Sequence, residues 1–321
     1  MLRAAIDIGS NTFRLLIARP SDHLAWETEY YTHRIVRLGE GLHQSGRLSD
    51  AGMERALAAL NEFAAIIQEH GLGPDRVCAV ATAAMREAEN GETLRDRILE
   101  QTGIEVRIID GNTEATMSLT GANAVLHTET RSDMLLFDIG GGSTEFVRAA
   151  NGQLQDAISR KLGVVRLVEA HLRSDPPAPA EYQAMMQTAD GHLAEVETCW
   201  IEGRGDGRAP RHLVGTAGTV TTLAAVHLEL HPYVVERINN HCISFAEFCT
   251  LRDRLLGMSH AERQALPTIE AGRADLMVAG LAIIETVYRR WGYPEMRVVD
   301  AGLLEGAWLA AGDQALSSAS G

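Results

Sequence analysis

Two short glycine-rich turns, each opening on an aspartate, are the parts of this sequence that most suggest chemistry. One reads DIGSNT from Asp7, and the other reads DIGGGST from Asp138. Such turns let backbone N–H groups approach an oxyanion, and hydroxyl and amide side chains add donors without adding charge. Two such turns facing each other would clamp one phosphate. The candidate phosphate ligands are Gly9, Ser10, Asn11, Thr12, Gly140, Gly141, Gly142, Ser143 and Thr144.

The two aspartates that open these turns suit a hard divalent cation. Mg²⁺ prefers carboxylate, water and substrate oxygens, so Asp138 and Asp7 are candidate ligands for Mg²⁺ or another divalent ion. For one copy alone, a plain tight hairpin would be the better interpretation. Because the pattern occurs twice and keeps the aspartate, we favour a binding site.

Three charged residues near expected strand ends are further candidates. Glu145 follows the second turn directly and, by strand alternation, can project toward a bound phosphate. Glu114 lies where a helix should begin, and there an acid either complements the helix dipole or does chemistry. Arg86 is expected near the start of a helix, where a cation opposes the dipole. That placement makes it a candidate for bidentate phosphate contacts, with an ordinary surface arginine as the alternative.

The surrounding pattern predicts strands and helices that would position these residues. Residues 4–18 and 134–149 both read as strand, turn and strand, which indicates a duplicated domain. Further expected helices are 50–70, 92–101, 181–199, 270–290 and one from about 303; expected strands are 77–82, 106–109, one ending at 214, and 297–299. Loops are expected at 174–180 and 202–211, and the charge-mixed stretch 252–263 reads as a solvated helical face.

Composition excludes several classes of function. The 321 residues carry 29 basic and 43 acidic side chains, a net charge of −14, which argues against nucleic acid or an anionic membrane as partner. Four cysteines without paired spacing indicate neither a zinc site nor a disulfide framework, which fits a reducing cytoplasm. The longest apolar run, 276–284, is far shorter than the ~20 residues that span a bilayer. The N-terminal stretch does not look like a signal peptide.

The ordered motifs resemble a known family over residues 6 to about 306. They are DIGSNT, ATAAMREAEN at 81–90, DGNTEA at 110–115, DIGGGSTEF at 138–146, LGVVRL at 162–167, GTAGTVTTLAA at 215–225 and PTIEAGRAD at 267–275. Together they resemble the exopolyphosphatase/guanosine pentaphosphate phosphohydrolase (Ppx/GppA) family. The resemblance implies an α/β fold of two actin-like (ribonuclease H-like) domains with the active site in the cleft between them. We expect one domain at 1–124, joined by the helix from about 303, and the other at 125–321.

The same resemblance implies Mg²⁺-dependent release of orthophosphate from the end of inorganic polyphosphate. Glu145 would orient or deprotonate the attacking water, and Glu114 would be a second catalytic carboxylate converging on that water across the cleft. The chain ends near the point where long family members add helical domains, so we expect a preference for short polymers. Leu304 stands where many members carry arginine, so one phosphate contact is expected to be missing. A homodimer is expected from the resemblance.

Other activities stay open at this point. Guanosine pentaphosphate (pppGpp) is an alternative substrate within the same chemistry. A sugar-kinase-like enzyme and a non-catalytic alarmone sensor are alternatives with the same architecture. The turn at 215–218 precedes a helix whose N-terminal amides could hold a second phosphate, although a plain strand-to-helix connection needs glycines as well.

Overall fold

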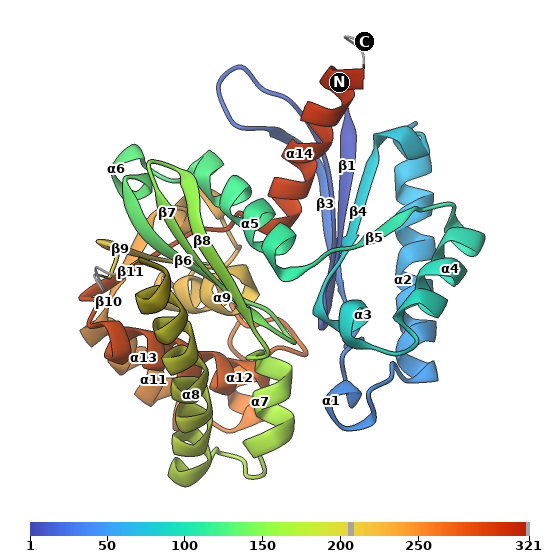
Figure 1. Ribbon diagram of the computed structural model, residues 1–321. Coiled ribbons are helices and arrows are strands. Elements are labelled where there is room, and N and C mark those ends of the chain that lie inside the picture. The colour runs from blue at the N-terminus through green and yellow to red at the C-terminus, as the bar shows by residue number, and fades with distance from the viewer. Residues whose placement is uncertain (205–208, 319–321) are drawn as a thin grey trace. The chain divides into compact units, whose positions relative to one another are not determined.

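The computed structural model describes residues 1–204 and 209–318, which fall into two compact units (Figure 1). Unit 1 holds Met1–Ala124 together with the chain from Ala301 onward, and unit 2 holds Val125–Asp300. Each unit is built on one mixed sheet flanked by helices. The α/β class with two sheet-based units, expected from the sequence, is confirmed.

Unit 1 is a five-stranded sheet of order β3-β2-β1-β4-β5. Its strands are β1 (Arg3–Ile8), β2 (Thr12–Arg19), β3 (Glu27–Ile35), β4 (Val77–Ala81) and β5 (Val106–Ile108). Its helices are α1 (Leu42–Ser45), α2 (Asp50–Glu69), α3 (Ala83–Glu87), α4 (Gly91–Thr102), α5 (Gly111–Val125) and α14 (Leu303–Ser318), with a 3₁₀ turn at Pro74–Arg76. The strands β1, β2 and β3 run antiparallel, and β4 and β5 run parallel to β1.

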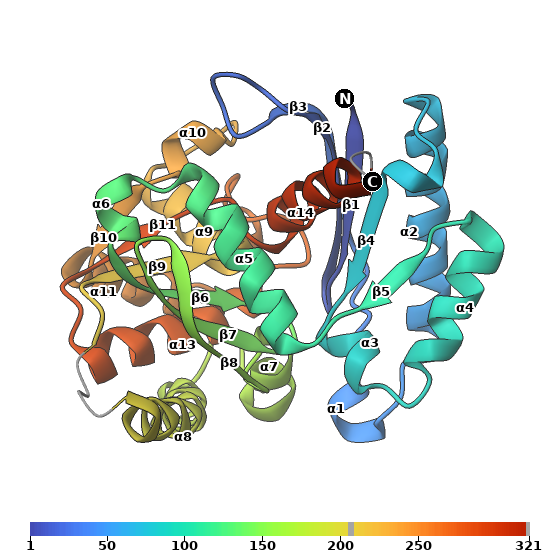
Figure 2. The ribbon, with the colours of Figure 1, turned by 45° about the horizontal axis from the view of Figure 1, so that its top comes forward.

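The two faces of the unit 1 sheet are covered by different helices (Figure 2). Because side chains alternate along β1, Ile6 packs into the cluster that contains Leu60 and Phe63 of α2. Ala5 points the other way and packs with Leu304 and Trp308 of α14. The last helix of the chain therefore completes the core of unit 1.

Unit 2 is a six-stranded sheet of order β10-β11-β9-β6-β7-β8. Its strands are β6 (Asp133–Ile139), β7 (Thr144–Ala150), β8 (Gln153–Arg160), β9 (His212–Thr216), β10 (His241–Ser244) and β11 (Glu295–Val298). Its helices are α6 (Thr128–Arg131), α7 (Val164–His171), α8 (Pro179–Arg204), α9 (Ala217–His227), α10 (Val235–Ile238), α11 (Phe245–Leu256), α12 (His260–Gln264) and α13 (Leu276–Trp291).

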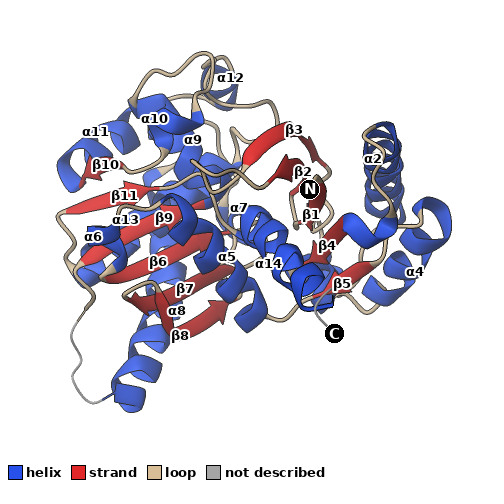
Figure 3. Ribbon diagram, turned by 90° about the horizontal axis from the view of Figure 1, so that it is seen from above, coloured by secondary structure: helices blue, strands red, loops and turns tan. Residues whose placement is uncertain are grey.

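The two sheets repeat one topology, which Figure 3 shows as two groups of red strands. In unit 2, β6, β7 and β8 form the antiparallel meander, and β9 and β11 continue the sheet in parallel from β6. This matches β1, β2, β3, β4 and β5 of unit 1, with β10 added at the edge as an antiparallel strand. The internal repeat read from the two aspartate turns is thus a repeat of the fold.

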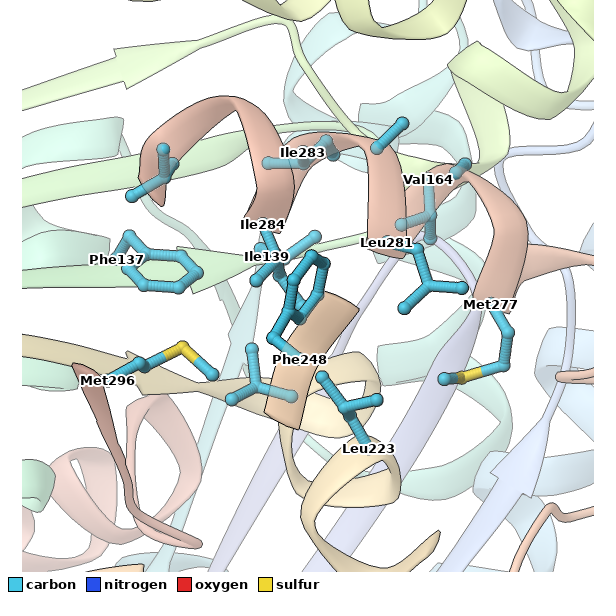
Figure 4. Close-up of a cluster of buried hydrophobic side chains, with 14 of the residues drawn as sticks. Phe137, Ile139, Val164, Leu223, Phe248, Met277, Leu281, Ile283, Ile284 and Met296 are labelled. Carbon is cyan, nitrogen blue, oxygen red and sulfur yellow. The ribbon is translucent and has the colours of Figure 1, made fainter. Parts of the chain in front are cut away.

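The core of unit 2 lies between its sheet and the helices that cover one face. Figure 4 shows Phe137 and Ile139 of β6 beside Leu281 and Ile284 of α13, with Phe248 of α11 packed among them. All five side chains are at most 3% exposed. Burial of an aromatic or branched aliphatic side chain contributes roughly 1.5–3 kcal/mol, so this face anchors β6 and the turn that follows it.

Two expectations for the region before α13 are wrong. The helix expected from 270 begins at Leu276, and residues 265–275 form turns. The stretch 252–263 is not a solvated face throughout, because Arg263 is 2% exposed and its Nε donates to the carbonyl oxygen of Ala274 at 3.0 Å. This buried arginine holds the turns in place of a longer helix. The loop expected at 202–211 lies partly outside the described residues.

Candidate active site

The glycine turn of unit 2 is held from one side by the segment that enters α7. The carbonyl oxygens of Gly140 and Gly141 accept hydrogen bonds from the N–H groups of Val164 and Val165, at 3.1 and 3.0 Å. Each of these bonds fixes one peptide plane of the turn. The turn is therefore a supported structure rather than a loose connection between β6 and β7.

Arg166 and Gly163 complete this support. Nε of Arg166 donates to the carbonyl oxygen of Gly142 at 2.7 Å. A Cβ atom on Gly163 would lie 2.2 Å from the carbonyl oxygen of Gly141, so this close approach requires glycine. In the described part of the chain, the N–H groups of Gly141, Gly142 and Ser143 make no hydrogen bond. They are donors available to an anion.

The glycine turn of unit 1 is supported in the same way. Its carbonyl oxygens accept from the segment that leaves β3: Gly39 N–H donates to Ser10 at 2.8 Å, and Val36 and Arg37 N–H both donate to Asn11 at 2.9 Å. Among the described residues, the N–H groups of Ser10 and Asn11 make no hydrogen bond. Both predicted phosphate turns thus present backbone donors on a fixed frame.

Beside the unit 2 turn, polar side chains form a row across four strands. In the sheet register Asp138 is opposite Glu145 on one side and Thr216 on the other, and Glu145 is opposite Ser159. Asp138 is 8% exposed and Glu145 is 1% exposed. Oγ of Ser159 donates to Oε1 of Glu145 at 2.7 Å. Two predicted site residues, Asp138 and Glu145, are therefore neighbours on one face of the sheet.

At the matching place in unit 1, an arginine stands where unit 2 has a glutamate. Asp7 is opposite Arg14, and Nε and Nη2 of Arg14 donate to Oδ2 of Asp7 at 2.9 and 2.6 Å. The other oxygen, Oδ1, is buried, and within the described residues it has no hydrogen-bond partner. The two copies of the hairpin have therefore acquired opposite charges at the same position.

Two further predicted residues, Arg86 and Glu114, meet within unit 1. Nη1 of Arg86 donates to Oε2 of Glu114 at 2.8 Å and to the carbonyl oxygen of Ile109 at 2.9 Å. Glu114 lies in the first turn of α5, as expected, and is buried. The helix argument for Arg86 was wrong, because the residue lies in the last turn of α3, which ends at Glu87. A cation in the last turn of a helix is favourable. The feature that makes Arg86 a candidate is therefore its ion pair with Glu114 and not an unfavourable position in the helix.

Asp110 fixes the start of the helix that carries Glu114. Its Oδ1 accepts the N–H of Thr113 at 2.8 Å, which is the bond of a helix N-cap. The same hydrogen bond, with help from the Thr113 hydroxyl, lowers the pKa of Asp110 from its ordinary value. Asp110 thereby sets where α5 begins and which face of it Glu114 occupies.

The predicted cation ligands differ in how well they suit Mg²⁺. Asp138 is a buried carboxylate beside the glycine turn of unit 2, an oxygen ligand of the kind that Mg²⁺ uses together with water and phosphate oxygens. Asp7 offers the buried Oδ1, but the bound guanidinium of Arg14 offsets its charge. In the described residues no three His, Cys, Asp or Glu side chains are grouped to hold a metal ion. The fit is therefore better in unit 2 than in unit 1.

The turn at 215–218 is a strand-to-helix connection with a basic neighbour. Ala217, the first residue of α9, has a φ of 71°, in the left-handed region. A Cβ atom on Gly218 would lie 1.9 Å from Nη1 of Arg273, so the guanidinium packs directly on the glycine. Phosphate binding by this turn stays a prediction.

Comparison with known proteins identifies the family. Residues 16–313 match the Ppx/GppA phosphatase family. The chain belongs to this family. Exopolyphosphatase 2 of Mycobacterium tuberculosis is 32% identical over 316 residues, which cover 94% of this chain and 96% of that relative. The Ppx/GppA resemblance read from the motifs is confirmed.

Solved structures agree with this assignment to Ppx/GppA. An exopolyphosphatase from Cytophaga hutchinsonii is 30% identical, with a TM-score of 0.88 and 98% of both chains covered. The Aquifex aeolicus Ppx/GppA family member is 27% identical, with a TM-score of 0.80 over 99% of this chain and 98% of that one. Across the described residues, no helix has the length and apolar character needed to cross a membrane.

Sequence reasoning missed three residues that contact the predicted site residues. Ser159 contacts Glu145, Arg166 holds the glycine turn, and Arg14 binds Asp7. Strand alternation could have found Arg14, because it occupies the position on its hairpin that Glu145 occupies on the other. Ser159 reaches Glu145 through the pairing of β7 with β8, and Arg166 reaches the carbonyl oxygen of Gly142 in the glycine turn. The spacing of residues in the sequence predicts neither contact.

Proposed function

We propose that this Ppx/GppA protein is an exopolyphosphatase, which hydrolyses the terminal phosphoanhydride bond of inorganic polyphosphate and releases orthophosphate. One observation carries the proposal. Glu145, a buried glutamate near the start of β7, lies beside Asp138 near the end of β6. The turn that joins these two strands presents backbone donors. The names of the relatives in M. tuberculosis and C. hutchinsonii support polyphosphate as the substrate.

The substrate is bound by the two glycine turns and by Arg86. The N–H groups of Gly141, Gly142 and Ser143 donate to oxygens of the terminal phosphate, and the N–H groups of Ser10 and Asn11 are further donors that suit a phosphate. These donors are fixed by the bonds to the loop carbonyls, so little reorganisation is needed when charge develops. The guanidinium of Arg86 offsets the charge of the leaving phosphate chain.

Hydrolysis needs a water molecule aligned with the bond that breaks. Glu145 accepts a hydrogen bond from that water and takes its proton as the new P–O bond forms. The bridging P–O bond breaks, and the shortened chain leaves with the electron pair. The transition state is loose, so Glu145 acts by aligning the water as well as by taking its proton. In this proposal Glu114 is the second catalytic carboxylate, supplied by unit 1.

A divalent cation, Mg²⁺ in the first instance, completes the proposed site. Asp138 would hold it; Asp7, the other predicted ligand, is paired with Arg14. Bound Mg²⁺ supplies positive charge that offsets the phosphate oxygens. The chain's own residues then position the water and the terminal phosphate.

Short polymers are the proposed preferred substrate. The net charge of −14 opposes long-range attraction of a long polyanion. In addition, Leu304, at a position where many family members carry arginine, is 0% exposed within the apolar core under α14 and cannot contact phosphate. The proposal includes a homodimer in the cytoplasm, as the family resemblance implies.

A phosphate-release panel tests this assignment. The folded protein is assayed with Mg²⁺ on short polyphosphate, long polyphosphate, pppGpp and ATP at equal concentrations of terminal phosphate. We expect the fastest release from short polyphosphate. Fastest release from pppGpp would identify the alternative activity, and transfer of the ATP phosphate to a sugar would identify a kinase. Tight binding of pppGpp without any release would identify a sensor.

A further inference from the structure

Ser159 lies outside the predicted motifs, and its hydroxyl donates a hydrogen bond to the proposed catalytic glutamate, Glu145. It lies one residue before the end of β8, opposite Glu145 of β7 in the sheet register. The Oγ···Oε1 distance of 2.7 Å is that of a strong hydrogen bond from a hydroxyl to a carboxylate. The contact joins residues 14 positions apart and depends on the β7–β8 pairing.

Burial makes this hydrogen bond consequential. Glu145 is 1% exposed, so bulk water does not readily replace a lost donor. A buried carboxylate that loses a donor bears the cost of its own desolvation. The residue opposite Glu145 on its other side is Asp138, which is also acidic and repels the carboxylate when both are ionised. Ser159 therefore supplies a donor on the side away from a like charge.

The hydrogen bond from Ser159 also fixes the orientation of the Glu145 carboxylate. A carboxylate is planar, so holding Oε1 against β8 sets the plane in which Oε2 lies. The main-chain position of Glu145 is already set by pairing with β6 on one side and β8 on the other. The hydroxyl of Ser159 then restrains the remaining side-chain rotation. Alignment of the attacking water depends on that rotation, because small misplacements of a reacting group cost large factors in rate.

We infer that Ser159 is a positioning residue for Glu145, holding its carboxylate in the orientation that aligns the attacking water. This inference rests on the proposed function, in which Glu145 directs water at the terminal phosphate. The hydroxyl of Ser159 donates to Glu145, which directs the water, and not to a group proposed to bind phosphate, so we expect its loss to affect turnover and not substrate binding.

The test compares Ser159→Ala with Ser159→Thr in the full chain. Ser159→Ala removes the donor, and we expect kcat for short polyphosphate to fall about 10-fold to 100-fold, as for loss of a hydrogen bond to a charged group, while KM changes less than about twofold. Ser159→Thr keeps a hydroxyl, and we expect it to recover kcat to within about fivefold of the wild type. The matched control is Ser132→Ala, which removes a 2.6 Å hydrogen bond to the carbonyl oxygen of Glu129 in the same unit. We expect wild-type kinetics for the control.

Each outcome decides between a positioning and a structural role. Equal losses in Ser159→Ala and Ser159→Thr, or a rise in KM with kcat unchanged, would overturn the inference. Wild-type kinetics for Ser159→Ala would overturn it as well. Glu145→Gln is assayed in parallel to separate the two proposals. If Glu145→Gln retains full turnover, the proposed function fails; if it loses turnover while Ser159→Ala does not, only the role of Ser159 fails.

Discussion

Arg86 and Glu114 form an ion pair, with Nη1 of the arginine 2.8 Å from Oε2 of the glutamate. One residue was predicted to bind phosphate and the other to direct water, and the fold brings them together from α3 and α5. The glutamate side chain is 9% exposed and the arginine side chain 23% exposed. The ion pair fixes the orientation of both side chains, and the second hydrogen bond of Arg86, to the carbonyl oxygen of Ile109, holds the arginine at the end of the sheet.

Replacing Arg86 should therefore harm both phosphate binding and the orientation of Glu114. We expect Arg86→Ala to lower kcat/KM for polyphosphate by roughly 100-fold or more, as for loss of a preorganised donor. Arg86→Lys keeps the charge but loses the planar fork, so it should recover only part of the activity. Steady-state phosphate release measures both variants.

Arg97→Ala is the matched control for this prediction. Arg97 forms an ion pair of the same length, 2.8 Å, with Glu54 on an exposed face of unit 1. Exposed ion pairs contribute little, so activity should stay within about twofold of the wild type. Equal effects of Arg86→Ala and Arg97→Ala would contradict a special role for the first pair.

The lowered pKa of Asp110 predicts that the free energy of unfolding depends on pH. Its pKa is lowered by the hydrogen bond from the Thr113 backbone, so the ionised form stabilises the folded state at pH values above the ordinary value of about 3.9. That contribution is lost as the pH falls through the lowered pKa. Asp110→Asn keeps an acceptor but carries no charge, so it lacks this pH-dependent contribution.

The measurement is urea unfolding of the wild type and Asp110→Asn between pH 7 and pH 3. We expect the wild type to be the more stable at pH 7 and the difference to shrink below about pH 4. A constant difference across this range would show that the Asp110 charge does not stabilise α5.

Much of the fold was predictable because its hairpin turns and helix starts are determined by residues that are neighbours in the sequence. The aspartate turns are hairpins between apolar, buried strands. Glu114 lies in the first turn of a helix that Asp110 caps by accepting the N–H of Thr113. The strands β3 and β8 were not predicted. They complete each meander by pairing with β2 and β7, and much of their outer face is exposed, so hydrophobicity marks them weakly.

The parts of the site that escaped prediction depend on tertiary contacts. Arg86 was assigned to a helix start, but α3 has five residues, and a Cβ atom on the following Gly91 would lie 2.0 Å from the carbonyl oxygen of Met85. The chain must turn there, which the local sequence does not reveal. Likewise, the start of α13 is delayed by the buried side chain of Arg263, whose partners lie outside its own helix.

Phosphate release by Glu145→Gln is the most direct test of the central claim. The substitution keeps the shape of a side chain that is 1% exposed and can still accept from Ser159, but it removes the charge and the ability to take a proton from water. We predict that turnover of short polyphosphate with Mg²⁺ falls by a factor of roughly 10²–10⁴, as for loss of a general base, while thermal unfolding stays close to that of the wild type. Turnover equal to the wild type in the folded variant would contradict the account.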